Sequence, residues 1–179
     1  ADIEIAATTK PGTFVIKMGD GKSVDYTLQP KSKDNGFSRV KGVNATDLVY
    51  LIMPDRFANG DPSNDRLPDQ EDKVADRSNP FARHGGDIRG VENNLDYLKD
   101  LGVTAVWMTP VFENNMPRMN EGRFNMSGYH GYWITNHYEV DKRMGGDVAY
   151  KNLIDAAHQK NMKIIQDAVY NHVGSYHHT

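Results

Sequence analysis

The sequence predicts an α/β domain built on a parallel β-sheet and preceded by an antiparallel hairpin. Three short apolar runs, at residues 48–53, 103–108 and 163–169, have the composition of buried parallel strands. A stretch with the periodicity of an amphipathic helix precedes each of the last two runs. This alternation favours a parallel sheet, either open and doubly wound or closed into a (β/α)₈ barrel.

The hairpin is predicted at residues 13–28, where apolar and polar side chains alternate on both sides of a Gly-Asp-Gly turn. Residues 3–7 have the composition of a third strand. The polar, Gly- and Asn-rich stretch after the hairpin indicates a linker. We therefore assign residues 1–33 to a first domain, 34–47 to a linker and 48–179 to the α/β domain.

Two helices are predicted between the strands. The first lies within residues 91–102 and has Gly102 where a left-handed C-terminal cap belongs. The second lies within residues 147–161, with Asp147 as the expected N-cap and Asn161 as the stop. Their apolar faces consist of Val91, Leu95, Leu98 and Leu101 in the first helix and Tyr150, Leu153, Ile154 and Ala157 in the second.

Two connections are unusually long, residues 54–90 and 109–146. Loops beyond about 12–15 residues are uncommon unless they are functional. In a barrel, catalytic groups lie at the carboxyl ends of strands, which is where Asp55, Thr109 and Asp167 fall. A barrel needs about 250 residues and eight strands. We therefore expect the chain to be the N-terminal part of a larger protein, or to lie beside a separate continuation.

The composition argues against several classes of function. The formal net charge is −3 and no run of Lys and Arg occurs, so a nucleic-acid footprint is missing. No apolar stretch approaches the roughly 20 residues of a membrane span. Without cysteine there is no disulfide, thiolate metal site or cysteine nucleophile. Because the chain opens with Ala1, we expect processing or excision from a longer chain; export is compatible with it, and so is the cytoplasm.

Three segments contain candidate site residues. The first segment has several Asn and Asp residues in one loop, and a stretch with Gly and Asp follows it. The oxygen atoms of these residues suit a hard cation such as calcium. A string of Asx turns, however, uses the same residue types. They are Asn59, Asp61, Asn64 and Asp65, then Gly85 and Asp87.

The second segment, residues 127–141, is rich in aromatic residues and histidine. Its rings suit the C–H faces of sugars, but they equally suit a packed loop. The rings in question are Tyr129, His130, Tyr132, Trp133, His137 and Tyr138.

The third segment follows the last apolar run and offers Asp167, Asn171 and His172. Asp167 is either catalytic or structural. No G-x-S-x-G elbow precedes it, which disfavours a serine hydrolase, and the spacing of His172, His177 and His178 lacks the H-E-x-x-H form of a zinc site.

Taken together, these segments resemble the α-amylase superfamily, glycoside hydrolase family 13, and most closely its cyclomaltodextrinase and neopullulanase-like subgroup. The resemblance spans residues 48–172 and is carried by YLIMPDRFANGDPSND, HGGDIRGV, LGVTAVWMTPVFEN, YHGYW, DKRMGGDVAYKNLIDAAH and DAVYNH. It implies the first three βα-type strands of a (β/α)₈ TIM barrel, preceded by the end of a β-sandwich domain.

The resemblance also implies roles for individual residues. Tyr132 matches the tyrosine that stacks on the sugar at the bond-cleaving subsite, with His130 nearby. His172 matches the histidine that hydrogen-bonds that sugar, and Asp167 an aspartate that orients the charged network without being the nucleophile. The calcium ligands implied are Asn59, Asp61, Asn64, Asp65, the Gly85 carbonyl and Asp87.

The function implied is retaining hydrolysis of α-1,4-glucans such as starch, maltooligosaccharides, cyclodextrins or pullulan. The family's nucleophile, acid/base and stabilising aspartate follow its fourth, fifth and seventh strands, so we expect this chain alone to be inactive. The alternative is a non-catalytic glucan-binding or transporter-associated relative. The expected partners are an α-glucan, the remainder of the barrel and, in a homodimer, a second copy, and the expected location is extracytoplasmic (periplasmic or secreted) and bacterial-type.

Overall fold

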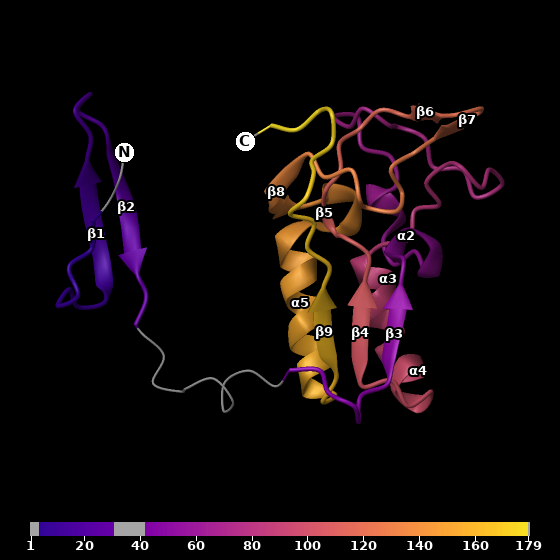
Figure 1. The fold of residues 1–179 in the computed structure, drawn as a ribbon, viewed down its shortest axis with the longest axis horizontal. Coiled ribbons are helices and arrows are strands. Elements are labelled where there is room, and N and C mark those ends of the chain that lie inside the picture. Colours follow the sequence, from indigo (N-terminus) through magenta and orange to yellow (C-terminus); the bar gives the residue numbers. More distant parts are fainter. Residues whose placement is uncertain (1–3, 31–41, 179) are drawn as a thin grey trace. The chain divides into compact units, whose positions relative to one another are not determined.

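The computed structural model describes residues 4–30 and 42–178 (Figure 1). The chain divides into two compact units, Ala1–Gly42 and Val43–Thr179. The division falls inside the segment predicted as a linker, of which residues 34–41 lie outside the described residues.

The first unit contains the predicted hairpin. Strands β1 (Gly12–Lys17) and β2 (Ser23–Leu28) pair antiparallel, and Gly21 in the turn has a φ of 82°. The prediction of a third strand is not met: residues 4–7 form no strand, and Ile3 lies outside the described part of the chain. That the hairpin ends a β-sandwich stays a prediction.

The second unit contains the predicted parallel sheet. Its strands are β3 (Val49–Ile52), β4 (Ala105–Met108) and β9 (Lys163–Gln166), in the order β3-β4-β9 (Figure 1). Both pairings are parallel, so the three carboxyl ends meet at one edge of the sheet. Any residue that follows a strand is therefore brought to that edge.

The helix predicted at residues 91–102 is broken in two, α3 (Ile88–Asn93) and α4 (Leu95–Asp100). Asn94 interrupts it because its backbone leaves the helical region (φ −108°, ψ 13°) and its side-chain amide donates to the Gly90 carbonyl at 2.7 Å. Leu101 was wrongly placed on the buried face, since it follows α4 and is 51% exposed. Gly102 has the predicted left-handed backbone, with a φ of 89°.

Helix α5 (Gly146–Gln159) begins differently from the prediction. Its N-cap is Gly145, with a φ of 100°, and not Asp147. Asp147 lies in the first turn, where its carboxylate accepts a hydrogen bond from the Val140 N–H at 2.9 Å. The helix ends as predicted, because Asn161 adopts a φ of 59° just beyond it.

The two long connections fold into short elements of their own. The first contains α2 (Pro54–Phe57) and the 3₁₀ turn η1 (Pro62–Asn64). The second contains two antiparallel pairs and a 3₁₀ turn. These are β5 (Phe112–Glu113) with β8 (Asn136–Val140), β6 (Met119–Glu121) with β7 (Phe124–Met126), and η2 (Lys142–Met144). No helix among the described residues is long and apolar enough to cross a membrane.

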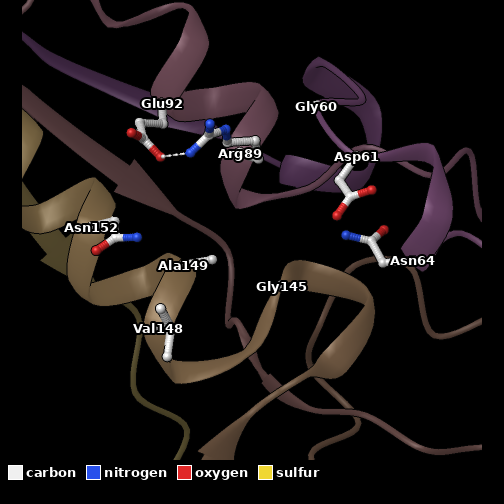
Figure 2. Close-up of a pocket in the computed structure, with 9 residues that line it drawn as sticks. All are labelled: Gly60, Asp61, Asn64, Arg89, Glu92, Gly145, Val148, Ala149 and Asn152. Atoms are coloured by element: carbon white, nitrogen blue, oxygen red, sulfur yellow. Dashed lines mark hydrogen bonds and ion pairs between the residues drawn. The ribbon is translucent and has the colours of Figure 1, made fainter.

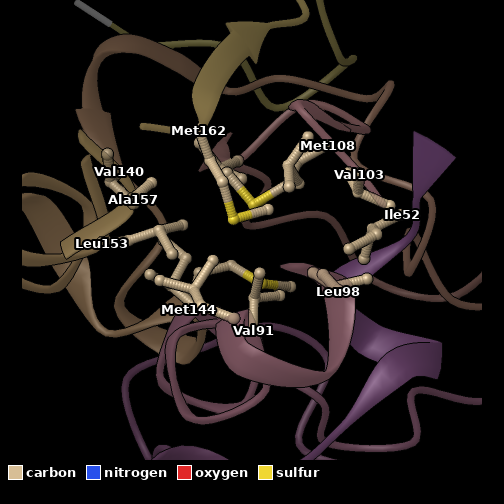
Figure 3. Close-up of a cluster of buried hydrophobic side chains, with 14 residues drawn as sticks. Ile52, Val91, Leu98, Val103, Met108, Val140, Met144, Leu153, Ala157 and Met162 are labelled. Atoms are coloured by element: carbon tan, nitrogen blue, oxygen red, sulfur yellow. The ribbon is translucent and has the colours of Figure 1, made fainter. Parts of the chain in front are cut away.

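Helices cover one face of the sheet and leave the other open. On the covered face, side chains such as Ile52 and Met108 pack against Leu98 and Leu153 in the main core (Figure 3). On the other face, Leu51 and Trp107 are paired across β3 and β4 yet remain 55% and 38% exposed. An open apolar face of this kind is what a partial barrel would present inward.

Candidate functional site

Residues that are far apart in the sequence meet at the carboxyl edge of the sheet. Asp167 directly follows β9, and its Oδ2 accepts a hydrogen bond from the Tyr132 phenol at 2.9 Å. The same oxygen accepts from the indole N–H of Trp107, on β4, at 3.2 Å. One carboxylate therefore orients an aromatic ring from a loop and another from the neighbouring strand.

The backbone of Tyr132 is held from both sides. His172 Nε2 lies 3.0 Å from the Tyr132 carbonyl, and the Tyr132 N–H donates to His130 Nδ1 at 3.0 Å. Gly131 between them has a φ of 86°, and a Cβ there would lie 2.0 Å from the Pro110 carbonyl oxygen, so no other residue fits. The four predicted substrate-binding residues thus form one connected group.

Burial sets the protonation of two members of this group, His130 and Tyr132. Burial lowers the pKa of His130 to about 4, and the nearby Arg83 contributes to the shift. The ring is therefore neutral near pH 7; because Nδ1 accepts from Tyr132, the proton sits on Nε2, which is a donor. Burial, then the bond to Asp167, raises the pKa of the Tyr132 phenol, so the phenol keeps its proton and donates it.

Two other rings of the aromatic segment have different surroundings. His137 Nε2 bonds the Val169 carbonyl at 2.9 Å, which ties the segment to the chain after β9. Tyr138 is 83% exposed and takes no part in the group. The aromatic segment is thus partly a packed loop and partly a wall of the site.

The Asx-rich loop has two buried oxygens that lack a partner. The amide Oδ1 atoms of Asn59 and Asn64 are buried without a hydrogen-bond donor among the described residues. An unpaired buried carbonyl oxygen is costly, and both amides belong to the predicted calcium ligands. These two orphan oxygens are therefore the strongest local indication of a cation in this loop.

Asp65 and Gly85 lie against each other in the same loop region. Gly85 has a φ of 83°, and a Cβ there would lie 2.6 Å from Asp65 Oδ1. Burial raises the pKa of Asp65, and the charge of Asp87 raises it further against the lowering effect of the Asn59 amide. A bound cation would relieve this accumulation of negative charge.

Asp87, also a predicted ligand, is fully buried and has many donors around it. Its Oδ1 accepts from the backbone N–H groups of Gly60 at 3.1 Å and Gly90 at 2.6 Å. Its Oδ2 accepts from the Asp61 N–H at 2.8 Å and the Asn64 amide at 3.3 Å. Through these bonds Asp87 ties the loop to the start of α3.

No three His, Asp or Glu side chains among the described residues converge as a metal site, so a cation here would depend on the amide oxygens. A pocket of about 390 Å³ adjoins the loop, with Asp61 and Asn64 at one end and α5 along its side (Figure 2). Across it, Arg89 pairs with Glu92 at 3.4 Å. The loop is thus open to solvent on its Asp61 side.

Arg56 is a site-region residue that the sequence did not single out. It follows Asp55 on α2 and its guanidinium carbon lies 3.9 Å from the centre of the Tyr129 ring. Asp55 was noted only for its place after β3, and the structure buries its carboxylate against the backbone N–H groups of His84 and Gly85. Only the contact across the fold identifies this pair.

A buried ion-pair network behind the aromatic segment was also missed. Arg143 pairs with Asp141 at 2.9 Å and donates to the Asn114 carbonyl at 2.6 Å. Burial by itself would raise the pKa of Asp141, but the guanidinium groups of Arg143 and Arg83 lower it to about 2. The network fixes the two ends of the long second connection to each other.

Comparison with known proteins agrees with this geometry. Residues 51–179 match the family described as "Alpha amylase, catalytic domain". The periplasmic α-amylase of Escherichia coli K12 is 36% identical over 191 residues, covering 96% of this chain and 28% of that protein. Neopullulanase 2 of Thermoactinomyces vulgaris is 39% identical over 128 residues, covering 71% of this chain and 20% of that one.

A solved structure with the same fold is the α-amylase of Geobacillus thermoleovorans complexed with acarbose. It matches with a TM-score of 0.56 at 40% identity, over 73% of this chain and 24% of that one. The chain therefore spans only 20% to 28% of the length of these three relatives, and its second unit is of the α/β TIM-barrel type.

Proposed function

The chain belongs to the α-amylase family, and on that premise we propose that the whole protein hydrolyses α-1,4-glucosidic bonds with retention of configuration. The whole protein here means this chain together with the remaining strands of its barrel. Its substrates are starch, maltooligosaccharides, cyclodextrins or pullulan. The observation that carries the proposal is the Tyr132 phenol bonded to Asp167 at the carboxyl end of β9, with His172 on the Tyr132 carbonyl.

These residues serve as a wall of the sugar site. The Tyr132 ring offers a flat apolar surface for one face of a glucose ring, and the neutral His130 offers an N–H donor for a hydroxyl. Asp167 already accepts two hydrogen bonds through one oxygen, so it positions the rings and is poorly suited to attack an anomeric carbon.

Retention needs two carboxyl groups about 5–5.5 Å apart on either side of the bond. We assign both to strands that would continue the sheet β3-β4-β9, which we propose as the first three of the barrel. The open face at Leu51 and Trp107 supports this, because further strands would enclose it. The chain alone then binds glucan weakly and does not cleave it.

The experiment is an assay of reducing sugar released from maltooligosaccharides, run on the 179-residue chain and on the whole protein. We expect release by the whole protein and none by the chain alone. Release by the chain alone would contradict the assignment of the carboxyl groups. Binding without release by the whole protein would favour the non-catalytic, glucan-binding alternative.

We also propose that the Asx-rich loop binds calcium. The orphan amide oxygens of Asn59 and Asn64 support this, together with the crowded carboxylate of Asp65. The other proposed ligands are Asp61, the Gly85 carbonyl and Asp87. The ion would hold the loop against the start of α3 and would take no part in bond cleavage.

Calcium binding is tested by thermal unfolding in calcium and in excess chelator. We expect calcium to raise the midpoint of the wild type and to leave that of Asn59→Ala nearly unchanged, since the variant lacks one of the orphan oxygens. Ser78→Ala, in an exposed turn outside the loop, is the matched control and should respond as the wild type does. Equal responses of all three proteins would overturn the proposal.

We further propose an extracytoplasmic location. The support is a relative named as periplasmic, which matches 96% of this chain. Fractionation of cells that express the whole protein tests it, and recovery in the cytoplasmic fraction alone would contradict it.

A further inference from the structure

Arg56 connects two loops that lie far apart in the sequence. Its Nε donates to Asp55 at 2.8 Å, and one terminal nitrogen donates to the carbonyls of Pro80 and Ala82, each at 2.9 Å. The other terminal nitrogen lies 3.1 Å from His84 Nε2. Three of its five N–H groups donate to oxygen acceptors, so the planar guanidinium has a fixed orientation.

The guanidinium carbon of Arg56 lies over the Tyr129 ring, 3.9 Å from the ring centre. Tyr129 meets His130 edge to face at 5.6 Å between ring centres, and His130 stacks with Tyr132 at 5.9 Å. The His130 ring also accepts the Tyr132 N–H. A row of contacts therefore runs from Arg56 to the ring proposed to stack on glucose.

The backbone between these rings leaves little freedom to adjust. Gly131 has a left-handed conformation and no room for a Cβ against Pro110. If Tyr129 loses its support, the displacement passes to His130 and through its hydrogen bond to Tyr132. A shift of this kind changes the geometry of a sugar platform without altering any residue that touches the sugar.

At its other end Arg56 is anchored in the first long connection. Asp55, its ion-pair partner, has a side chain only 2% exposed and accepts the N–H groups of His84 and Gly85. Gly85 in turn lies against Asp65 of the Asx-rich loop. Arg56 thus links the first long connection to the aromatic segment through non-covalent contacts.

We propose that Arg56 is a positioning residue for glucan binding, which acts by stacking on Tyr129 and thereby holding His130 and Tyr132 in place. The inference rests on the proposed function, because it names how the sugar wall is held. It assigns Arg56 no contact with substrate.

The test is a double-mutant cycle on the whole protein, with acarbose binding measured by titration calorimetry well below the unfolding temperature. Arg56→Lys keeps the charge but loses the planar stack and most of the hydrogen bonds. Tyr129→Leu removes the ring from the other side of the contact. Tyr129→Phe is the matched control, since it keeps the ring on which the guanidinium lies.

We expect Arg56→Lys and Tyr129→Leu each to weaken acarbose binding by about threefold to tenfold, the change to which a cation–π contact of this kind corresponds. Tyr129→Phe should bind as the wild type does. The double variant should be no weaker than the weaker single variant, because both changes break one contact.

A merely structural role for Arg56 would give a different pattern. It would lower the unfolding midpoint while leaving the affinity of the folded protein unchanged, or would give additive losses in the double variant; either result overturns the proposal. If Arg56→Lys does not fold, the acarbose affinities of Tyr129→Leu and Tyr129→Phe are compared instead. Equal affinities of these two variants would then overturn the proposal. Failure of the wild type itself to bind acarbose would instead refute the proposed function.

Discussion

Replacement of Asp87 by asparagine should destabilise the protein, because Asp87 holds the Asx-rich loop against the start of α3. The carboxylate is fully buried and accepts four N–H groups, two on each oxygen. Asparagine has the same shape, but it replaces one oxygen with an NH₂ group. If the new NH₂ group takes the place of Oδ1, it faces the N–H groups of Gly60 and Gly90; in place of Oδ2 it faces the Asp61 N–H, since the Asn64 amide can turn its oxygen toward it.

The magnitude follows from the bonds that are lost. One or two hydrogen bonds to a buried charged acceptor, at about 1.5–3 kcal/mol each, amount to a destabilisation of about 1.5–6 kcal/mol. The unfolding midpoint should fall by this energy divided by the urea slope of the transition, which is about 2 kcal/mol per M for a small domain and larger for a larger protein. This loss is a large fraction of the stability of an ordinary domain.

The assay is urea denaturation of the whole protein followed by far-UV circular dichroism. Asp76→Asn is the control, because Asp76 also accepts hydrogen bonds through one oxygen, from the Ser78 N–H at 2.9 Å and its hydroxyl, but lies in an exposed turn. It should unfold close to the wild-type midpoint. A midpoint for Asp87→Asn as close to wild type as that of the control would show that these hydrogen bonds do not stabilise the loop.

Three further predictions concern the sugar wall. Tyr132→Phe keeps the ring and loses the bond to Asp167, so acarbose affinity should fall by about fivefold or less, whereas Tyr132→Ala should lose tenfold or more by the same calorimetry, since stacking is lost as well. The folded-state pKa of His130 is about 4, below its ordinary value of 6.5. The stability that its neutral ring contributes is therefore fully present above pH 6.5 and is lost as the pH falls through 4. NMR titration should show no protonation of this ring above about pH 5.5. Gly131→Ala places a Cβ against the Pro110 carbonyl and should abolish soluble, folded protein in expression trials, unlike Gly122→Ala, whose Cβ would meet open space.

The sheet was predictable because its signals are local. Each of the three apolar runs reads as a buried strand by itself, and the structure pairs them parallel as expected. Gly102 and Asn161 were equally readable, since a left-handed residue just after a helix has few alternatives in sequence. Patterns that depend on the residue and its immediate neighbours were therefore recovered.

Two of the errors occurred where a polar side chain had more than one possible partner. Asp147 has the residue type of an N-cap, but its carboxylate instead accepts a hydrogen bond from the Val140 N–H on the preceding strand β8. Asn94 breaks a helix because its amide finds the Gly90 carbonyl. The spacing of apolar residues predicts neither of these hydrogen bonds, because it is the same for a continuous helix and for a broken one.

The site itself was predictable only in part. Tyr132, His172 and Asp167 came from a resemblance, and the structure brings them together. The roles of Trp107 and Arg56 had no local signal, since they depend on contacts with Asp167 and Tyr129 across many residues of sequence. The spacing of residues along the chain does not predict such contacts. The contact between Trp107 and Asp167 follows from the pairing of β4 with β9 in the sheet.

Retention of configuration can be observed by proton NMR of maltoheptaose during cleavage by the whole protein. The new reducing end should appear first as the α-anomer and convert slowly to the β-anomer in solution, as a retaining mechanism requires. First appearance of the β-anomer, or no cleavage at all, would contradict the account.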